Sequence, residues 1–291
     1  MDIQSALVVG GDGLIAPALA AHLKADSWRV TCTSRREHLP SGWLHFDLKD
    51  GVDTLPHAVV QQADVVFLCA AVTGFTSCAN DPEGSRHINV TRSVELGRRF
   101  MQNGAHLVYL SSNAVFDGTQ SMLDEFAPTN PVTEYGRQKT ECEEALLAAA
   151  QELSGNCSVV RLTKVVDSAQ PLYSGWVRSF KEQAPAKAAT DLVLCPVTTA
   201  YVASGLGSIG ACKLGGVYHL SGERDMTYHE LASSMASMFA QGNAVEGECV
   251  QQRLGAVPSP AFSALSMVHT AQTFGIKPQL LIEVARELTG Y

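Results

Sequence analysis

The chain of 291 residues lacks the sequence features of several protein classes. No apolar run approaches the roughly 20 residues that a membrane-spanning helix needs. The N-terminal sequence MDIQSALVVGG has no basic region ahead of its apolar residues, so no secretory signal is predicted. The eight cysteines include no C-x-x-C pair, and the nine histidines show no H-x-x-x-H spacing or clustered carboxylates. We therefore expect a cytoplasmic protein with buried or inert thiols, no disulfides and no metal site.

Charge is also sparse and acidic on balance. Lys and Arg total 21 against 29 Asp and Glu, which gives a net charge of −8 and a pI of about 5.6. Such a balance disfavours a nucleic-acid partner but leaves room for a local basic pocket that binds a small molecule. With 46% hydrophobic residues and no internal repeat, the chain fits one large globular domain, or a main domain with a smaller appendage.

Short apolar runs alternate with helical patterns through the first 166 residues. Strands are predicted over 6–11, 29–34, 63–71, 106–112 and 158–166, and helices over 14–25, 88–104 and 135–153. This alternation predicts an α/β fold with right-handed crossovers, a doubly wound parallel sheet of the Rossmann type. The continuous apolar runs agree, since parallel strands are covered on both faces.

The pattern loosens after residue 166, and 167–191 shows no clean period. Tyr173 and Trp176 in that segment fit either a substrate cleft or simple packing. The later elements expected are a strand over 216–222, a helix over 227–240 with a Thr227–Glu230 capping box, and a helix over 278–290 begun by Pro278.

We therefore predict two domains. Residues 1–166 form a dinucleotide-binding Rossmann domain, whose sheet is completed by later strands near 191–197 and 216–221. Residues 167–291 form mainly a small C-terminal substrate-binding lobe.

A glycine-rich turn follows the first predicted strand. Gly10, Gly13 and Ala16 have G-x-x-G-x-x-A spacing between a strand and a helix. Small residues there let backbone N–H groups and the helix N-terminus approach a pyrophosphate. A purely structural turn would show the same spacing, but the strand-to-helix context favours a dinucleotide site.

The end of the second strand distinguishes NADP from NAD. It reads TSRRE, with Ser34, Arg35 and Arg36 where an acidic residue would bind the ribose 2′-hydroxyl of NAD. Basic residues there predict NADP, unless the two arginines are only solvated surface residues beside Glu37. Asp47 and Leu48, after a short third strand, are placed for the adenine edge.

Tyr135 precedes Lys139 by four residues, so both lie on one helix face. That spacing alone is more often coincidence than catalysis. Its place in the chain is more specific, together with the glycine loop and the motifs FDL (46–48), CAA (69–71), INVT (88–91), LSSNAVFDG (110–118), YGRQK (135–139), VVRL (159–162), GVYHLSG (216–222) and SPAFSALSM (259–267).

In their order, these motifs resemble the extended short-chain dehydrogenase/reductase family, most closely its dTDP-4-dehydrorhamnose reductase-like or NAD-dependent epimerase branch. The resemblance implies that Ser112, Tyr135 and Lys139 are catalytic. It implies a cofactor site formed by Gly10, Gly13, Leu14, Ile15, Ser34, Arg35, Arg36, Asp47, Leu48, Ala70, Ala71, Tyr135, Lys139 and Leu162. It implies substrate contacts from Val72, Asn113 and Lys164.

The chemistry of the trio follows from acidity. A phenol with a pKa near 10 exchanges protons poorly at neutral pH, and a nearby ammonium is expected to lower that pKa. The Ser112 hydroxyl would hold a substrate carbonyl beside Tyr135, which protonates the oxygen as hydride reaches the carbon.

Three positions depart from the family pattern. Asn113 stands where sugar dehydratases have an acid, which disfavours dehydration. Ser259 replaces the arginine of the family's R-P-x-x-S-x-L segment. Lys164 stands where many epimerases have asparagine, and it or Arg161 would meet a phosphate unless Arg161 is a buried structural residue.

We therefore expect an NADP-dependent reductase of a keto group on a nucleotide-activated deoxysugar. A sugar-nucleotide epimerase, a reductase of a non-sugar carbonyl compound, and a non-catalytic cofactor-binding regulatory subunit remain as alternatives. The resemblance also suggests a homodimer paired through the helices at 88–103 and 135–153.

Overall fold

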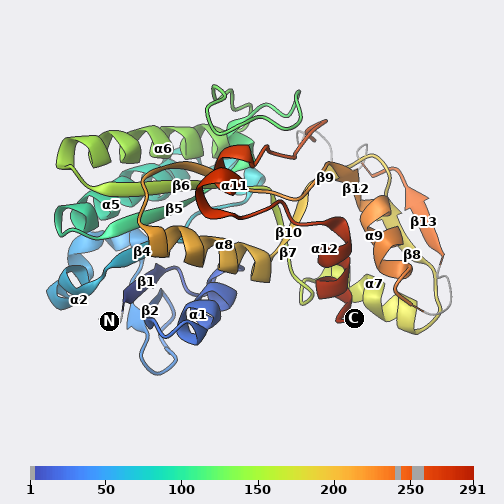
Figure 1. The fold of residues 1–291 in the computed structure, drawn as a ribbon, viewed down its shortest axis with the longest axis horizontal. Coiled ribbons are helices and arrows are strands. Elements are labelled where there is room, and N and C mark those ends of the chain that lie inside the picture. The colour runs from blue at the N-terminus through green and yellow to red at the C-terminus, as the bar shows by residue number, and fades with distance from the viewer. Residues whose placement is uncertain (1–3, 240–243, 251–258) are drawn as a thin grey trace. The chain divides into compact units, whose positions relative to one another are not determined.

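The computed structural model describes residues 4–239, 244–250 and 259–291. The chain divides into two compact units (Figure 1). The first unit combines Met1–Phe116, Pro128–Arg161 and Val202–Tyr218. The second combines Asp117–Ala127, Leu162–Tyr201 and His219–Tyr291. Each unit is therefore assembled from segments that are far apart in sequence.

A seven-stranded sheet is the centre of the fold, in the order β11-β6-β5-β4-β1-β2-β3. Its strands are β1 (Ser5–Val9), β2 (Arg29–Ser34), β3 (Leu44–His45), β4 (Val65–Leu68), β5 (His106–Ser112), β6 (Asn156–Leu162) and β11 (Gly216–Leu220). Neighbours from β3 across to β5 pair in parallel. This is the doubly wound Rossmann-type sheet that the sequence predicts.

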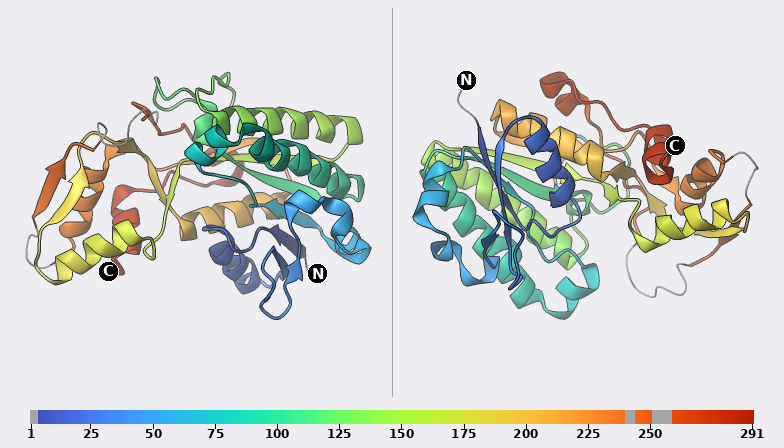
Figure 2. Two further views of the ribbon diagram at one scale, coloured as in Figure 1. Left: turned by 180° about the vertical axis from the view of Figure 1, so that it is seen from behind. Right: turned by 90° about the horizontal axis from the view of Figure 1, so that it is seen from below.

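Helices cover both faces of this sheet (Figure 2). One face carries α2 (His57–Gln62), α5 (Ser93–Gln102) and α6 (Glu134–Leu153), and the other carries α1 (Ala16–Ala25) and α8 (Thr199–Cys212). Leu7 and Leu107 pack with Leu96 and Leu146 on the first face. On the second face a Cβ at Gly210 of α8 would lie 2.6 Å from the Phe67 ring. Alternate residues of each strand therefore pack into two separate apolar layers, one on each face of the sheet. This is why the strand sequences are continuous apolar runs.

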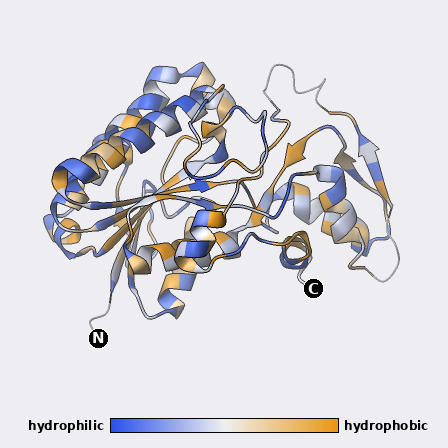
Figure 3. Cartoon of the chain, turned by 45° about the horizontal axis from the view of Figure 1, so that its top comes forward, coloured by the Kyte–Doolittle hydropathy of each residue, from blue (hydrophilic) through white to orange (hydrophobic). Residues whose placement is uncertain are grey.

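Short elements complete the first unit. They are α3 (Phe75–Asn80), α4 (Pro82–Arg86), a π-helical turn at His87–Arg92, and 3-10 turns at Leu48–Asp50, Val52–Thr54 and Asn113–Val115. Figure 3 shows apolar residues along the strands and mixed apolar and polar stripes along the helices that cover them.

The second unit has its own small sheets and core. Its elements are β7 (Lys164–Val166), α7 (Pro171–Lys181), β8 (Ala186–Ala189), β9 (Val193–Leu194), β10 (Pro196–Thr198), β12 (Met226–Thr227), α9 (Tyr228–Ala236), β13 (Val245–Glu248), α11 (Val268–Phe274) and α12 (Leu281–Thr289). β7 pairs with β10, β8 with β13 and β9 with β12. Tyr173 and Trp176 are buried in the core of this unit, so they serve packing rather than a cleft.

Several expectations about the second half need correction. The strand near 191–197 does not complete the central sheet, because β9 and β10 lie in separate two-stranded sheets. These strands are two and three residues long, and Pro196 has no N–H to donate to a central ladder. β11 does join the sheet. The predicted strand over 158–166 is two strands, β6 and β7, with Thr163 between them.

Some of the helices predicted for the second half of the chain are confirmed, and others differ from the prediction. The Thr227–Glu230 capping box of α9 is confirmed. α12 begins at Leu281, so Pro278 precedes the helix instead of opening it. α7 occupies part of the segment 167–191 that shows no clean period, and α8 was not predicted.

All eight cysteines are free thiols, five of them buried, while Cys212 and Cys249 are exposed. Within the described ranges, no helix is long and apolar enough to cross a bilayer, and no group of His, Cys, Asp or Glu is arranged to hold a metal ion.

Candidate functional site

The glycine loop after β1 lies against the ends of two neighbouring strands. Gly10 has a φ of +88°, and a Cβ there would lie 2.8 Å from Ala70 just beyond β4. The Gly10 N–H donates to the Thr33 hydroxyl at 3.1 Å, and the Gly11 N–H donates to the Thr33 carbonyl at 2.7 Å. A side chain at position 10 would push the loop away from β4, so glycine is required there for close approach.

The first turn of α1 leaves its backbone donors uncapped. Its N-cap residue, Ile15, makes no side-chain cap hydrogen bond, and the first turn contains no acidic residue. Gly13 and Leu14 lie exposed just before it. Uncapped N–H groups at the positive end of a helix favour an anion, so these residues fit the pyrophosphate of a dinucleotide.

A carboxylate reaches the tip of β2 from outside the strand. Ser34 is 2% exposed, and its hydroxyl donates to Asp12 of the glycine loop. The Arg36 guanidinium lies 3.0 Å from the other Asp12 oxygen, and the Arg36 N–H donates to the Ser34 hydroxyl at 3.0 Å. Arg35 is exposed beside them. None of the residues 34–36 at the end of β2 is acidic, but the fold places the Asp12 carboxylate of the glycine loop against Ser34 and Arg36.

The residues predicted for the adenine edge have structural roles as well. Asp47 caps a 3-10 turn by accepting the Lys49 N–H at 3.0 Å. Leu48 is 4% exposed and packs in the core beneath α5. Because the Leu48 side chain is buried in the core, only the backbone of this residue is free to contact a ligand.

The proposed catalytic hydroxyls meet where β5 ends and α6 begins. Thr133 caps α6 by accepting the Gly136 N–H at 3.0 Å. A Cβ at Gly136 would lie 2.1 Å from the Ala114 carbonyl oxygen, so glycine lets the first turn of α6 press against the backbone after β5. Tyr135 is 8% exposed, and the Ser112 hydroxyl lies close enough to its phenol to lower the phenol's pKa.

Burial dominates the acidity of Tyr135. It raises the pKa of the phenol above its ordinary value, and the nearby Ser112 hydroxyl only partly offsets this. The expected lowering of this pKa by Lys139 is not found. Desolvation disfavours the phenolate, and the ammonium points to a different partner.

That partner is the backbone at the end of β5. The Lys139 ammonium donates to the Leu110 carbonyl at 2.7 Å. It lies 4.5 Å from the centre of the Tyr109 ring and 5.7 Å from that of Tyr135. Lys139 is 3% exposed, and burial lowers its pKa to about 8. The Leu110 hydrogen bond and the two aromatic faces stabilise this ammonium.

A buried ion pair lies one helical turn further along α6. Glu143 and Arg161 are 2% and 5% exposed, with 2.7 Å between their charged atoms. The Ser111 hydroxyl also donates to Glu143, and the Arg161 guanidinium lies 5.1 Å from the centre of the Phe116 ring. Arg161 is therefore a structural residue joining β6 to α6, not a phosphate ligand.

Asn89 is a further site residue that we did not single out in the sequence. It is 1% exposed in the π-helical turn. Its amide accepts the Val72 N–H at 2.8 Å and donates to the Val72 carbonyl at 2.9 Å and to Gln138 at 2.8 Å. It thus fixes the backbone after β4 against α6, beside Lys139. The signal was present, since a polar residue stands inside the apolar INVT pattern.

The residues predicted to bind substrate belong to different units of the chain. Asn113 follows Ser112 in the first unit, and its side-chain oxygen lies 3.3 Å from the Ser112 hydroxyl. Leu162 and Lys164 belong to the second unit, where Leu162 is 5% exposed and Lys164 is exposed at the start of β7. Their predicted contacts with cofactor and substrate stay predictions.

The SPAFSALSM segment is held firmly within the second unit. Asp225 accepts the backbone N–H groups of Ser263 and Ala264 at 2.5 and 2.7 Å. The Phe262 N–H donates to the Gly118 carbonyl at 2.9 Å. Ser259, which stands at the position of the family's arginine, is the first residue of this segment.

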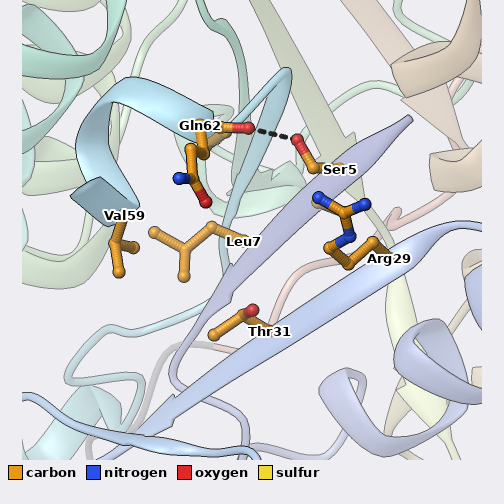
Figure 4. A pocket seen from close by; sticks show the side chains of 8 residues that line it. Ser5, Leu7, Arg29, Thr31, Val59 and Gln62 are labelled. Atoms are coloured by element: carbon orange, nitrogen blue, oxygen red, sulfur yellow. Dashed lines mark hydrogen bonds between the residues drawn. The ribbon is translucent and has the colours of Figure 1, made fainter. Parts of the chain in front are cut away.

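A hollow of about 60 Å³ lies at the edge of the sheet where β1 and β2 begin, the amino ends of these strands (Figure 4). Its lining includes Ser5 and Arg29, the first residues of β1 and β2. The candidate residues of the first unit instead follow the carboxyl ends of β1, β2, β4 and β5. In open α/β sheets ligands bind at that carboxyl edge, so we place the site there and not at the hollow.

Comparison with known proteins identifies the family and the fold of the chain. The family described as "RmlD substrate binding domain" matches residues 4–287. Methionine adenosyltransferase 2 subunit beta of Xenopus tropicalis is 27% identical over 275 residues, covering 88% of this chain and 78% of that protein. A dTDP-4-dehydrorhamnose reductase of Sinorhizobium fredii (strain NBRC 101917 / NGR234) is 25% identical over 284 residues, covering 93% and 91%.

Among solved structures, a dTDP-4-dehydrorhamnose reductase from Bacillus anthracis str. Ames in complex with NADP superposes with a TM-score of 0.79. The superposition covers 99% of each chain at 19% identity, and it shows the shared fold. Because the family match spans nearly the whole chain, the protein belongs to the RmlD substrate-binding domain family.

Proposed function

We propose that this protein is an NADP-dependent oxidoreductase that reduces a keto group on a nucleotide-activated deoxysugar. The observation that carries the proposal is the buried Tyr135 at the start of α6, with the Ser112 hydroxyl beside it at the end of β5 and the buried Lys139 one turn further along α6. The family match and the dTDP-4-dehydrorhamnose reductase relative support this reaction class.

Each side chain has a separate part in the reaction. The Ser112 hydroxyl donates to the substrate carbonyl oxygen and holds it next to Tyr135. Burial keeps the Tyr135 phenol protonated, so it is a proton donor to the oxygen as negative charge develops there. Lys139 keeps a positive charge near the phenol, with its ammonium 5.7 Å from the centre of the Tyr135 ring, and it would hold the ribose of the cofactor. The bound nicotinamide supplies the hydride to the carbonyl carbon.

The first unit fits the dinucleotide at three places. The Gly10 turn and the uncapped start of α1 suit the pyrophosphate. The donors at the tip of β2, Ser34 and Arg36, suit a 2′-phosphate. The NADP complex of the Bacillus anthracis reductase supports this choice of cofactor.

A binding titration followed by a substrate panel tests the proposal. NADPH and NADH are titrated by fluorescence, and the protein is then assayed with nucleotide-4-keto-sugars and simple ketones. We expect NADPH to bind and to be consumed with a nucleotide-4-keto-sugar. Binding of neither dinucleotide would contradict the cofactor site. Turnover of simple ketones alone would move the substrate class to non-sugar carbonyl compounds. Isomerisation of a nucleotide sugar without net NADPH consumption would identify an epimerase.

A second candidate is a cofactor-binding subunit of a methionine adenosyltransferase assembly. The 27% identity to methionine adenosyltransferase 2 subunit beta favours it. Its test is co-purification with a methionine adenosyltransferase catalytic chain. A stable complex whose adenosyltransferase activity changes on binding, with no turnover of the carbonyl panel, would select this candidate over the reductase.

We also propose a homodimer that pairs through α5 and α6. Within one chain these helices are joined by the Arg98–Glu152 ion pair at 2.7 Å. Analytical ultracentrifugation tests the proposal, and a monomer at micromolar concentration would reject it.

A further inference from the structure

Asp12 occupies the junction between the glycine loop and the tip of β2. One of its oxygens accepts the Ser34 hydroxyl, and the other lies 3.0 Å from the Arg36 guanidinium. Asp12 is 29% exposed at its side chain, and Ser34 is buried. A single carboxylate thus holds both donors that the sequence assigns to a 2′-phosphate.

This arrangement changes the electrostatics of the ribose end. A 2′-phosphate dianion reaching the Ser34 hydroxyl would have to displace the Asp12 carboxylate, and at the mostly exposed Arg36 guanidinium it would share the cation with that carboxylate. It would then lie next to a like charge, which is unfavourable. A ribose 2′-hydroxyl carries no charge and is a suitable donor to a carboxylate, as in NAD sites where an acid stands at this strand tip.

We propose that Asp12 is a specificity-determining residue, which weakens the preference for NADPH and lets the same site accept NADH. The inference rests on the proposed dinucleotide site. It assigns to the glycine loop a selectivity that is usually assigned to the strand tip. Arg36 favours the 2′-phosphate, Asp12 opposes it, and the measured preference reflects the balance of the two.

Glu37 provides a matched control. It lies just beyond the tip, one residue after Arg36 in the same TSRRE segment, and it is exposed. Glu37→Gln removes the same formal charge as Asp12→Asn, but from a side chain that is not hydrogen-bonded to Ser34 or ion-paired with Arg36. A general effect of net charge would appear in both variants, whereas a specific effect appears only at position 12.

The experiment measures dissociation constants of NADPH and NADH for the wild type, Asp12→Asn, Asp12→Ser and Glu37→Gln. For Asp12→Asn we expect the NADPH constant to fall about tenfold, because the like charge is removed. The NADH constant should change little, because the amide oxygen of the variant still accepts a hydrogen bond from the ribose 2′-hydroxyl, so the ratio of the two constants shifts toward NADPH. Asp12→Ser removes the charge with a smaller side chain and should shift the ratio in the same direction. Adenosine 2′,5′-bisphosphate and adenosine 5′-monophosphate, which differ only in the 2′-phosphate, should repeat the shift without a nicotinamide.

The outcomes separate the inference from the proposed function. If neither dinucleotide binds the wild type, the proposed function fails and this inference fails with it. If both bind and neither Asp12 variant shifts the ratio, or Glu37→Gln shifts it equally, only the inference is overturned. Retained NADH binding shows that a variant is folded. If Asp12→Asn fails that check, the result for Asp12→Ser decides.

Discussion

Two neighbouring turns of α6 handle buried charge in opposite ways. At the first turn, the Lys139 ammonium is buried with a backbone carbonyl and aromatic faces, and no carboxylate among the described residues lies within ion-pair distance. At the next turn, Glu143 and Arg161 are buried as a close pair. Burial lowers the pKa of Lys139 to about 8. A cation without a carboxylate partner is costly to keep, and such a group is typical of a functional site. A buried cation paired with a carboxylate, such as Arg161, is typical of a residue that stabilises the fold.

The largest expected effect is on catalysis at the first turn. Tyr135→Phe removes only the phenolic hydroxyl, the proton donor of the proposed reaction. We expect kcat for the keto substrate to fall by about 10³-fold, within the range for loss of a general acid. NADPH affinity should stay close to wild type. Unchanged kcat would remove Tyr135 from the site while leaving the fold intact.

The next effect is on stability at the second turn. Glu143→Gln leaves Arg161 buried without its carboxylate, and we expect the free energy of unfolding to fall by about 3 to 5 kcal/mol. Arg161→Met leaves the Glu143 carboxylate buried without its cation and should lower the free energy of unfolding by a similar amount. The double variant Glu143→Gln/Arg161→Met should cost less than the sum of the two, measured by urea denaturation. Strict additivity would mean that the pair does not act as a unit.

A buried base at the amino end of β5 extends the comparison. His106 is 1% exposed and hydrogen-bonds with the Ser158 hydroxyl at 3.0 Å. Burial lowers the pKa of its imidazole from 6.5 to about 4. The unfolded chain therefore binds a proton between these values and the folded chain does not. Stability is retained above pH 6.5 and is lost as pH falls through that window, by about 3 kcal/mol.

The control for this prediction is His106→Gln. Its free energy of unfolding, compared with wild type from pH 7 to pH 4, should lack this component of the pH dependence. If the two proteins lose stability in parallel across that range, the imidazole is not the group responsible.

The smallest effect tests the cost of the unpaired lysine. Lys139→Met should raise the free energy of unfolding at pH 7 by about 1 to 2 kcal/mol, because the gain from removing a buried charge exceeds the loss of one hydrogen bond. The folded pKa lies below the unfolded value. The wild type should therefore gain stability as pH rises from about 8 to 10.5, and the difference from Lys139→Met should shrink there. A destabilised Lys139→Met would show that the ammonium is well paired after all.

Residues 1–166 were easier to predict from the sequence than the rest of the chain, for physical reasons. β2 and β5 match their predicted bounds because both faces of a parallel strand are buried, which leaves a clear apolar run. α8 was missed because Thr199–Cys212 contains no charged residue, so it has no polar face to reveal its period. α7 was missed although Tyr173, Trp176 and Phe180 are buried at helical spacing, since Gly175 and the serines weaken the pattern.

Site residues differ in the same way. Tyr135 and Lys139 are close in sequence, so helical spacing places them together. Asp12 reaches Ser34 and Arg36 across two elements, and only the fold of the β1–α1 loop brings it to the strand tip. The raised pKa of Tyr135 likewise depends on burial at the start of α6, which spacing along a helix does not reveal.

Transfer of deuterium from deuterated NADPH to a nucleotide-4-keto-sugar tests the central claim most directly. The account predicts that the wild type places deuterium on the carbinol carbon of the alcohol product. It also predicts that Tyr135→Phe, which still binds NADPH, transfers little. If the wild type binds both NADPH and the keto-sugar but transfers no deuterium, the Ser112–Tyr135–Lys139 site is not a site of hydride transfer, and the account is contradicted.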